Sequence, residues 1–259
     1  MSSDRYLINS VLRANQILES FTPQKAAYTN AELSKKLGLN KGALTRLLYT
    51  LEKTGFLERD SKSKEYRLTY RIFRIGNVYI GQVDLHREAM PQLSKLVTLC
   101  QETVHLAILN EFRVFYLDKV ESPQSIRMIS RIGSTSPAYC TGVGKILLAH
   151  IEEDELERFF RAVELKRYTP NTICDPIELK LNLKRIREQG YAIDDSEHEH
   201  DVRCVAAPIR DRNDSVIAAI SISGPLFRMT REKMENEYVH AVKSTAKTIS
   251  DRLGFLGMR

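Results

Sequence analysis

The chain has 259 residues, of which 42% are hydrophobic and 28% are charged, a balance typical of globular domains. No apolar run approaches the roughly 20 residues that a membrane-spanning helix needs, and the first residues, MSSDRYLINS, lack the apolar stretch of a secretion signal. Four widely spaced cysteines match neither a disulfide framework nor a zinc ribbon. We therefore expect a cytoplasmic protein of two domains, without membrane association or cofactor.

The positive charge of the chain is concentrated in its first third. Residues 1–81 contain 14 Lys and Arg against 7 Asp and Glu, whereas the net charge of the whole chain is only +6. A compact basic module joined to a larger, nearly neutral part indicates that the module binds a polyanion. The larger part is then expected to have a different task.

The pattern of residues 7–60 predicts a helix-turn-helix. Residues 7–21, LINSVLRANQILESF, have the apolar spacing of a first helix. Further on, Leu33 and Leu37 are followed by Gly38, and a second set of leucines occupies positions 44, 47, 48 and 51. Glycine supplies the left-handed conformation that ends a helix, so two helices are expected to meet at a tight turn. A helical hairpin that serves only for packing is the alternative.

The outward residues at the start of the second of these helices are candidates for contact with the major groove, where Arg is a frequent partner of guanine. They are Asn40, Lys41, Gly42, Thr45 and Arg46. Residues 55–69, GFLERDSKSKEYRLT, then alternate as two short strands around a polar turn, which is typical of a wing. Three cations of the wing, Lys62, Lys64 and Arg67, are expected beside the DNA backbone.

Residues 72–83 and 90–99 have helical apolar spacing and predict a linking helix followed by the first helix of a second domain. Apolar residues on such a linker favour packing against a partner chain, which would place two recognition helices about 34 Å apart on successive major grooves. Burial within one chain is the alternative.

The remaining sequence alternates between strand and helix patterns, which predicts an α+β domain with a mostly antiparallel sheet covered by helices. Strands are expected at 102–109, 113–120, 125–132, 204–211 and 215–225. Helices are expected at 144–150, 153–163 and 175–191, with a closing helix of about 25 residues at 230–255.

Several of these stretches together resemble the IclR family of bacterial transcription regulators: ETVHLAILNEFRVFYLDKVESPQSIRMISRIGS, PAYCTGVGKILLAH, GYAIDDSEHEHDVRCVAAPIRD and AAISISGP, with GALTRLLYTLEKTGFLERDSKSKEYRLT before them. The resemblance implies a winged helix-turn-helix domain at 1–70, a linker helix at 71–87 and a GAF-like effector domain at 88–259. It further implies dimers or tetramers that bind promoter DNA and respond to a small carboxylate or keto acid. SIRMISRIGS and ELKRYTPNTI resemble regulators of sugar-acid catabolism within the family.

The resemblance also implies an effector pocket between the loop before the GK helix and the sheet. Its members would be Met128, Gly142, Val143, Asp194, Cys204, Ser221 and Ser223. Alternation along a strand agrees, because Ser221 and Ser223 lie two residues apart and face the same way, and the amides that begin a helix at Gly142 favour an anion. Gly42 departs from the family, where Ser or Thr is common at this position.

Some of these residues also fit other kinds of chemistry. GVGK at 142–145 lacks the Ser or Thr that follows the lysine of a phosphate-binding loop. Cys140 or Cys204 with His105 would need a positioned base to act as a nucleophile, and His198 with His200 would be a zinc pair only if both faced one way near Cys204. We therefore predict a transcription regulator that is not an enzyme and holds no metal. A sensor that acts through protein partners, and an enzyme on a GAF-like scaffold, are the alternatives.

Overall fold

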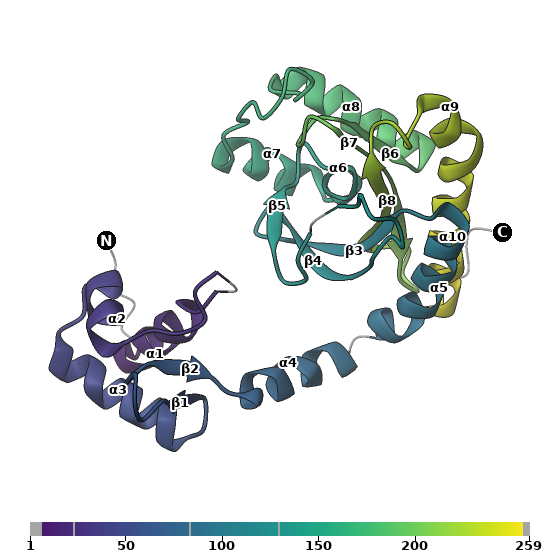
Figure 1. Cartoon of the computed structure of the whole chain (residues 1–259). Helices are drawn as coiled ribbons and strands as arrows, with labels where there is room; N and C mark the ends of the chain where they lie inside the picture. The colour runs from purple at the N-terminus through teal and green to yellow at the C-terminus, as the bar shows by residue number, and fades with distance from the viewer. Residues whose placement is uncertain (1–6, 23, 83, 129, 256–259) are drawn as a thin grey trace. The chain divides into compact units, whose positions relative to one another are not determined.

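The computed structural model describes residues 7–22, 24–82, 84–128 and 130–255. The chain divides into two compact units, residues 1–82 and residues 83–259, and each is described by itself (Figure 1). α4 and the start of α5 occupy the segment 71–87 that the sequence assigns to a linker. None of the helices in the described part of the chain is long and apolar enough to cross a membrane.

The first unit is a winged helix-turn-helix, as predicted. Its elements are α1 (Asn9–Glu19), α2 (Asn30–Leu37), α3 (Lys41–Lys53), β1 (Leu57–Arg59), β2 (Tyr66–Leu68) and α4 (Tyr70–Gln82). The leucine stripes of α2 and α3 meet Ile17 of α1, and Leu33, Leu44 and Leu48 are completely buried there. Burial of these side chains fixes the angle between α2 and α3, since each fully buried leucine contributes about 1.5–3 kcal/mol.

Local capping sets the ends of the two helices. Thr29 and Glu32 form a reciprocal capping box at the start of α2, which satisfies amides that the first turn leaves free. Gly38 ends α2 with φ of +63°, a left-handed conformation that glycine adopts without steric cost. The hydroxyl of Ser34 donates to the carbonyl of Leu39 at 2.7 Å and holds the turn closed.

The second unit contains one six-stranded sheet in the order β5-β4-β3-β8-β7-β6, and all its pairings are antiparallel. The strands are β3 (Thr103–Asn110), β4 (Arg113–Val120), β5 (Thr135–Pro137), β6 (Ala192–Asp195), β7 (Val202–Arg210) and β8 (Val216–Pro225). The helices are α5 (Asp84–Cys100), α6 (Gly142–Leu148), α7 (Glu153–Ala162), α8 (Pro176–Gln189), α9 (Arg231–Lys233) and α10 (Val239–Arg252), with a π-helical turn at Met234–Tyr238.

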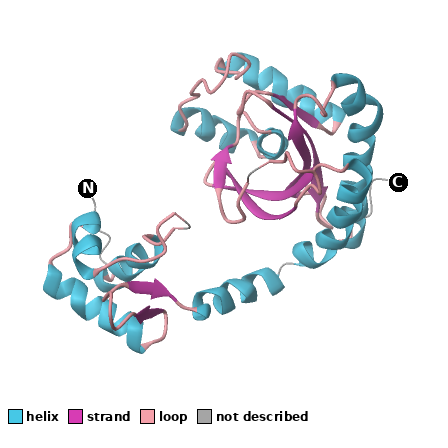
Figure 2. Cartoon of the chain, viewed as in Figure 1, coloured by secondary structure: helices cyan, strands magenta, loops and turns pink. Residues whose placement is uncertain are grey.

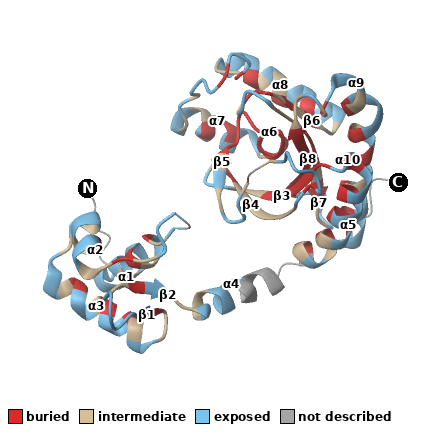
Figure 3. Ribbon diagram, in the orientation of Figure 1, coloured by how far each residue is buried: buried red, intermediate tan, exposed pale blue. Residues whose placement is uncertain are grey.

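Helices cover both faces of the sheet (Figure 2). Even-numbered residues of β3 and β8, such as Leu106 and Ile220, pack against α5 and α10. Odd-numbered residues, such as Ala107 and Ala219, face the side of α6, α7 and α8, as the alternation of a strand requires. Buried residues accordingly concentrate along the sheet and in α6 (Figure 3). The small odd-numbered residues let α6 approach the sheet closely.

One sequence prediction for this unit was wrong. The stretch 125–132 is an irregular loop outside the sheet, apart from Ile129, which lies outside the described residues. Side chains hold this loop: Ser130 Oγ lies 2.8 Å from His105 Nε2, and Lys119 Nζ donates to the Ser130 carbonyl. The edge position beside β4 belongs to β5. The helix predicted at 230–255 is present as a continuous helical segment at 231–252, and it includes a π-helical turn with the buried side chains of Met234 and Tyr238.

Candidate functional site

The first candidate site is the exposed face of α3. Lys41, Gly42, Thr45 and Arg46 all lie on this face, and Asn40 precedes it as the N-cap. The face is opposite the leucines that anchor α3 in the core. The structure thus places the five predicted DNA-contacting residues of the helix together at its N-terminal end, where recognition helices commonly meet base edges.

Three of these five residues, Asn40, Gly42 and Thr45, also stabilise the start of α3. Asn40 Oδ1 accepts the amide of Gly42 at 2.8 Å and thereby caps α3. Thr45 Oγ1 donates to the carbonyl of Lys41 at 2.7 Å and accepts from Asn30 Nδ2 at 3.0 Å. A Cβ on Gly42 would lie 3.3 Å from the capping oxygen of Asn40, so the glycine leaves room for the cap.

The wing presents its three predicted cations to solvent. β1 pairs with β2 in an antiparallel register that sets Glu58 opposite Arg67. Lys62 and Lys64 lie in the turn between the strands, and Arg67 lies on β2. Asp60 accepts the amides of Lys62 and Ser63, which holds the turn in shape and keeps the pKa of its carboxyl low. The hairpin therefore presents a fixed positive tip.

The second candidate site is a cavity of about 380 Å³ between α6, the sheet and the loop before β5. This volume is in the range of small-molecule sites. All seven predicted effector residues line it: Met128, Gly142, Val143, Asp194, Cys204, Ser221 and Ser223. The lining also includes His105, Tyr116, Ser130, Arg131, Ser134, Ser136, Thr141, His198, Glu199 and Val202.

Strand register explains why polar residues so distant in sequence meet in this cavity. Asp194 of β6 lies directly opposite Cys204 of β7, which lies opposite Ser223 of β8. In the adjacent row, Ser221 lies opposite His105 of β3. The two rows share one face of the sheet, because Ser221 and Ser223 are two residues apart on the same strand.

His105 is the centre of a hydrogen-bond network at the floor of the cavity. Its Nε2 lies 2.8 Å from Ser130 Oγ, and its Nδ1 lies 3.3 Å from Ser223 Oγ. Ser221 Oγ lies 3.1 Å from Ser223 Oγ and joins the same network. Burial lowers the pKa of His105 to about 4, with a smaller effect from Lys119, so the imidazole is neutral at physiological pH and offers one donor and one acceptor.

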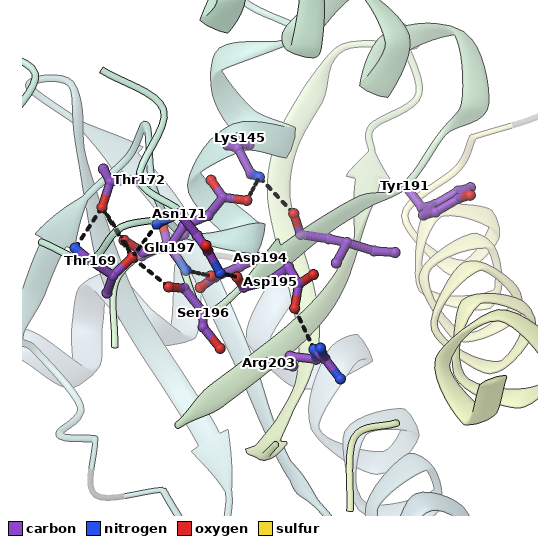
Figure 4. Close-up of polar contacts among 12 residues, drawn as sticks. Lys145, Thr169, Asn171, Thr172, Tyr191, Asp194, Asp195, Ser196, Glu197 and Arg203 are labelled. Atoms are coloured by element: carbon purple, nitrogen blue, oxygen red, sulfur yellow. Dashed lines mark hydrogen bonds and ion pairs between the residues drawn. The ribbon is translucent and has the colours of Figure 1, made fainter. Parts of the chain in front are cut away.

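Asp194 is the acidic group of the cavity, and its side chain is almost fully buried. Burial raises its pKa to about 7, and the nearby carboxylate of Glu197 adds to this shift. Its Oδ1 accepts the Glu197 amide at 2.7 Å. The next residue, Asp195, points to the other side of β6 and pairs with Arg203 (Figure 4). Of these two consecutive aspartates, Asp194 therefore lines the cavity and Asp195 forms an ion pair.

A buried ion pair lies behind the cavity. Lys145 of α6 is 1% exposed; its Nζ contacts Glu197 Oε1 and also donates to the Ile193 carbonyl at 2.6 Å (Figure 4). The other carboxylate oxygen of Glu197 has no hydrogen-bond partner among the described residues. Lys145 ties α6 to the end of β6 and is not part of the cavity lining.

The geometry disfavours the alternative chemistries. GVGK forms the first turn of α6 and is buried, so it does not present a phosphate-binding loop. Burial raises the pKa of both the Cys140 and the Cys204 thiols, which disfavours a reactive thiolate. His198 and His200 lie in a bend after β6 instead of on a strand. The described residues contain no group of three metal-type side chains that could hold an ion.

Sequence reasoning missed part of this site. His105 was considered only as a base for a cysteine, and Tyr116 and Arg131 received no role. Their positions depend on the β3–β4–β8 pairings and on the course of an irregular loop, which no local spacing reveals. The ion pair between Lys145 and Glu197 joins residues that are 52 positions apart. A single lysine within the otherwise apolar segment GVGKILLA was the available signal.

Comparisons with known proteins match both parts of the chain. A protein-family model described as "IclR helix-turn-helix domain" matches residues 10–61, and one described as "Bacterial transcriptional regulator IclR C-terminal" matches residues 77–251. The HTH-type transcriptional regulator KdgR of Escherichia coli (strain K12) is 37% identical over 248 residues, which cover 96% of this chain and 94% of KdgR.

Solved structures share the whole architecture. The IclR crystal structure of Thermotoga maritima matches with a TM-score of 0.78 and 36% identity, over 95% of this chain and 99% of that chain. An IclR homolog of Microbacterium hydrocarbonoxydans complexed with 4-hydroxybenzoate has the same fold, with a TM-score of 0.85 at 24% identity over 94% of this chain and 98% of that one.

A winged helix-turn-helix joined to a domain with a polar, ligand-sized cavity defines a class of protein, the DNA-binding transcription regulators that respond to a ligand. Within that class, the chain belongs to the IclR family. The family and the fold class predicted from the sequence are thereby confirmed.

Proposed function

We propose that this regulator is a cytoplasmic protein without enzymatic activity that binds promoter DNA through α3 and the wing. A small organic acid in the cavity of the second unit would change its affinity for DNA. The single observation that carries the proposal is that one cavity unites all seven residues expected to contact an effector. A coupling free energy of about 1–3 kcal/mol between the sites gives a five- to 150-fold change in DNA affinity.

The chemistry of the lining supports a small acid that also carries hydroxyl or keto oxygens. The floor offers uncharged hydrogen-bonding groups, namely the imidazole of His105 and the hydroxyls of Ser221 and Ser223. Asp194 can accept from a hydroxyl. Arg131 lies in the same lining as the carboxyl groups of Asp194 and Glu199, and its guanidinium group can pair with a ligand carboxylate. The complex of an IclR homolog with 4-hydroxybenzoate is one example of an acid bound by this fold.

The protonation of the Cys204 thiol and the surroundings of His105 support a sensor rather than an enzyme. A hydrolase that uses a cysteine or serine nucleophile needs a thiolate or an activated serine beside a general base. Burial keeps the Cys204 thiol protonated, and the described residues place no carboxylate on the ring of His105. The relatives that match most of the chain are named as transcription regulators. Recovery of a bound ligand unchanged after long incubation is expected, and turnover would contradict the proposal.

We also infer a homodimer or a dimer of dimers. Large apolar side chains are exposed on two helices of the first unit, Ile8 and Val11 at α1 and Tyr70 and Phe73 on α4. Exposed apolar side chains that gather on one module are typical of an interface with another chain. A symmetric dimer would present two copies of α3 to successive major grooves. Sedimentation velocity at several concentrations tests the assembly, and a monomer at every concentration would contradict it.

A two-variant experiment tests the DNA and effector sites separately. A thermal-shift screen of small organic acids first identifies a ligand of the parent protein, and gel shifts with DNA from upstream of its gene and neighbouring genes identify a target. Arg46→Ala is expected to weaken DNA binding while the ligand still raises the melting temperature. Asp194→Ala is expected to keep DNA binding and lose the ligand response. Two variants that both behave like the parent would refute the assigned residues.

A further inference from the structure

The exposed face of α3 continues beyond Arg46 toward the C-terminal end of the helix, and it includes Tyr49. In a helix with 3.6 residues per turn, positions 42, 46, 49 and 53 fall within an arc of about 60°. The buried side chains of Leu44, Leu48 and Leu51 occupy the opposite side. Tyr49 is 58% exposed, so its ring stands on the surface that faces away from the core.

The spacing of this face matches the way recognition helices read DNA. Positions 42, 45, 46 and 49 follow the order i, i+3, i+4 and i+7, by which one helix in the major groove reaches successive bases. Gly42 has no side chain, and the Thr45 hydroxyl already donates to the Lys41 carbonyl. Arg46 and Tyr49 are therefore the two of these four positions that have long side chains available for contact.

The surroundings of Tyr49 suit a contact with a base. Among the described residues its ring contacts one charged group, Lys53 Nζ, which lies 5.5 Å from the ring centroid. Lys53 is exposed one turn further along the same stripe, where it can meet a phosphate and hold the helix in register. An aromatic ring on this stripe presents an apolar surface, which in the major groove matches the methyl group of thymine.

We propose that Tyr49 is a specificity-determining residue, whose ring packs against a thymine methyl in the operator while Lys53 binds the adjacent phosphate. The inference rests on the proposed use of α3 as the recognition helix. Contact by Tyr49 would extend the DNA-contacting face of α3 by about one helical turn beyond Arg46. Each base pair read in this way contributes to specificity, because a mismatch at one position weakens binding by roughly fivefold or more.

A selection from a random pool of double-stranded DNA tests this inference without knowledge of the operator. The full-length parent, Tyr49→Ala, Tyr49→Gln and Arg46→Ala are each used to enrich DNA, which is then sequenced. Tyr168→Ala is the matched control, because Tyr168 is another exposed tyrosine and lies in the second unit. Circular dichroism verifies that each variant keeps its helices; alanine and glutamine are both good helix formers, and Tyr49→Gln keeps a long side chain while it removes the ring.

The expected result is local. Tyr49→Ala and Tyr49→Gln should each lose or change the preference for thymine at one base-pair position, by about fivefold, next to the positions that Arg46→Ala alters. Tyr168→Ala should select the parental motif. Variants at Tyr49 that keep the parental preference at every position, or that weaken binding to all sequences equally, would overturn the inference. A parent protein that enriches no motif would overturn the proposed function itself, and this inference with it.

Discussion

The raised pKa of Asp194 leads to a quantitative prediction about the pH dependence of stability. The side chain is 3% exposed, and its Oδ1 accepts the amide of Glu197. Asp194→Asn keeps an oxygen acceptor of the same shape but removes the ionisable group. The substitution therefore isolates the free energy of ionising this one carboxyl in the folded protein.

The magnitude follows from the difference between the folded and unfolded pKa values. Burial raises the pKa of Asp194 from 3.8 to about 7, so as pH rises the unfolded chain releases this proton before the folded protein does. Stability contributed by the protonated form is complete below pH 3.8 and is lost as pH rises through 7. One pKa unit corresponds to about 1.4 kcal/mol, which gives a total loss of about 4 kcal/mol, of which roughly 2–3 kcal/mol falls between pH 5 and pH 8.

Urea unfolding at pH 5, 6, 7 and 8, followed by circular dichroism, measures this effect. The unfolding free energy of the parent should fall by roughly 2–3 kcal/mol more over this range than that of Asp194→Asn. Asp195→Asn is the matched control: its arginine partners hold the pKa of that carboxyl below its usual range, so its contribution is lost only at acidic pH. Equal pH slopes for the parent and Asp194→Asn would refute the assignment of a raised pKa to Asp194.

Three further substitutions test the packing around the two sites. A Cβ at position 144 would lie 2.3 Å from the Ala138 carbonyl oxygen, so Gly144→Ala should lower stability by about 1–3 kcal/mol in thermal unfolding; Gly142→Ala, whose Cβ would meet its nearest neighbours at 3.4 Å, is the tolerated control, and an equal loss in both would contradict this reasoning. Asn40→Ala removes the cap of α3 and should cost about 1 kcal/mol, whereas Asn40→Ser should retain most of it; unchanged unfolding of the first unit in Asn40→Ala would exclude a capping role. Lys145→Met leaves Glu197 buried without its cation and should cost about 3–5 kcal/mol, and a parental melting temperature would show that the pair is dispensable.

Much of the first unit could be predicted because its signals are local. Gly38, the leucine spacing of α2 and α3, and the polar turn of the wing each act within a few residues, so periodicity and turn chemistry define them directly. The same reasoning stopped at Arg46 and omitted Tyr49. Helical spacing already places Tyr49 on the outward face, but an aromatic residue is more often part of a core, and the observed exposure shows that this one is not.

The sequence predicted only part of the effector cavity. Its seven predicted residues were found through the family resemblance and the alternation of SIS, and the structure brings all of them to one cavity. The strand predicted at 125–132 was wrong because strand alternation does not show whether an edge is available for pairing. At this edge β5 pairs with β4, and side chains from β3 and β4 hold the loop instead.

The sequence by itself determined the two-part organisation, the winged helix-turn-helix, the concentration of positive charge in the first unit and, through the family resemblance, seven of the 17 residues that line the cavity. Tertiary structure decided the electrostatics of that cavity. The neutral state of His105, the raised pKa of Asp194 and the ion pair of Lys145 with Glu197 all depend on burial and on contacts between residues that are distant in the chain. Desolvation depends on the packed three-dimensional surroundings of a group, and for that reason the sequence alone does not define the charge states of these residues.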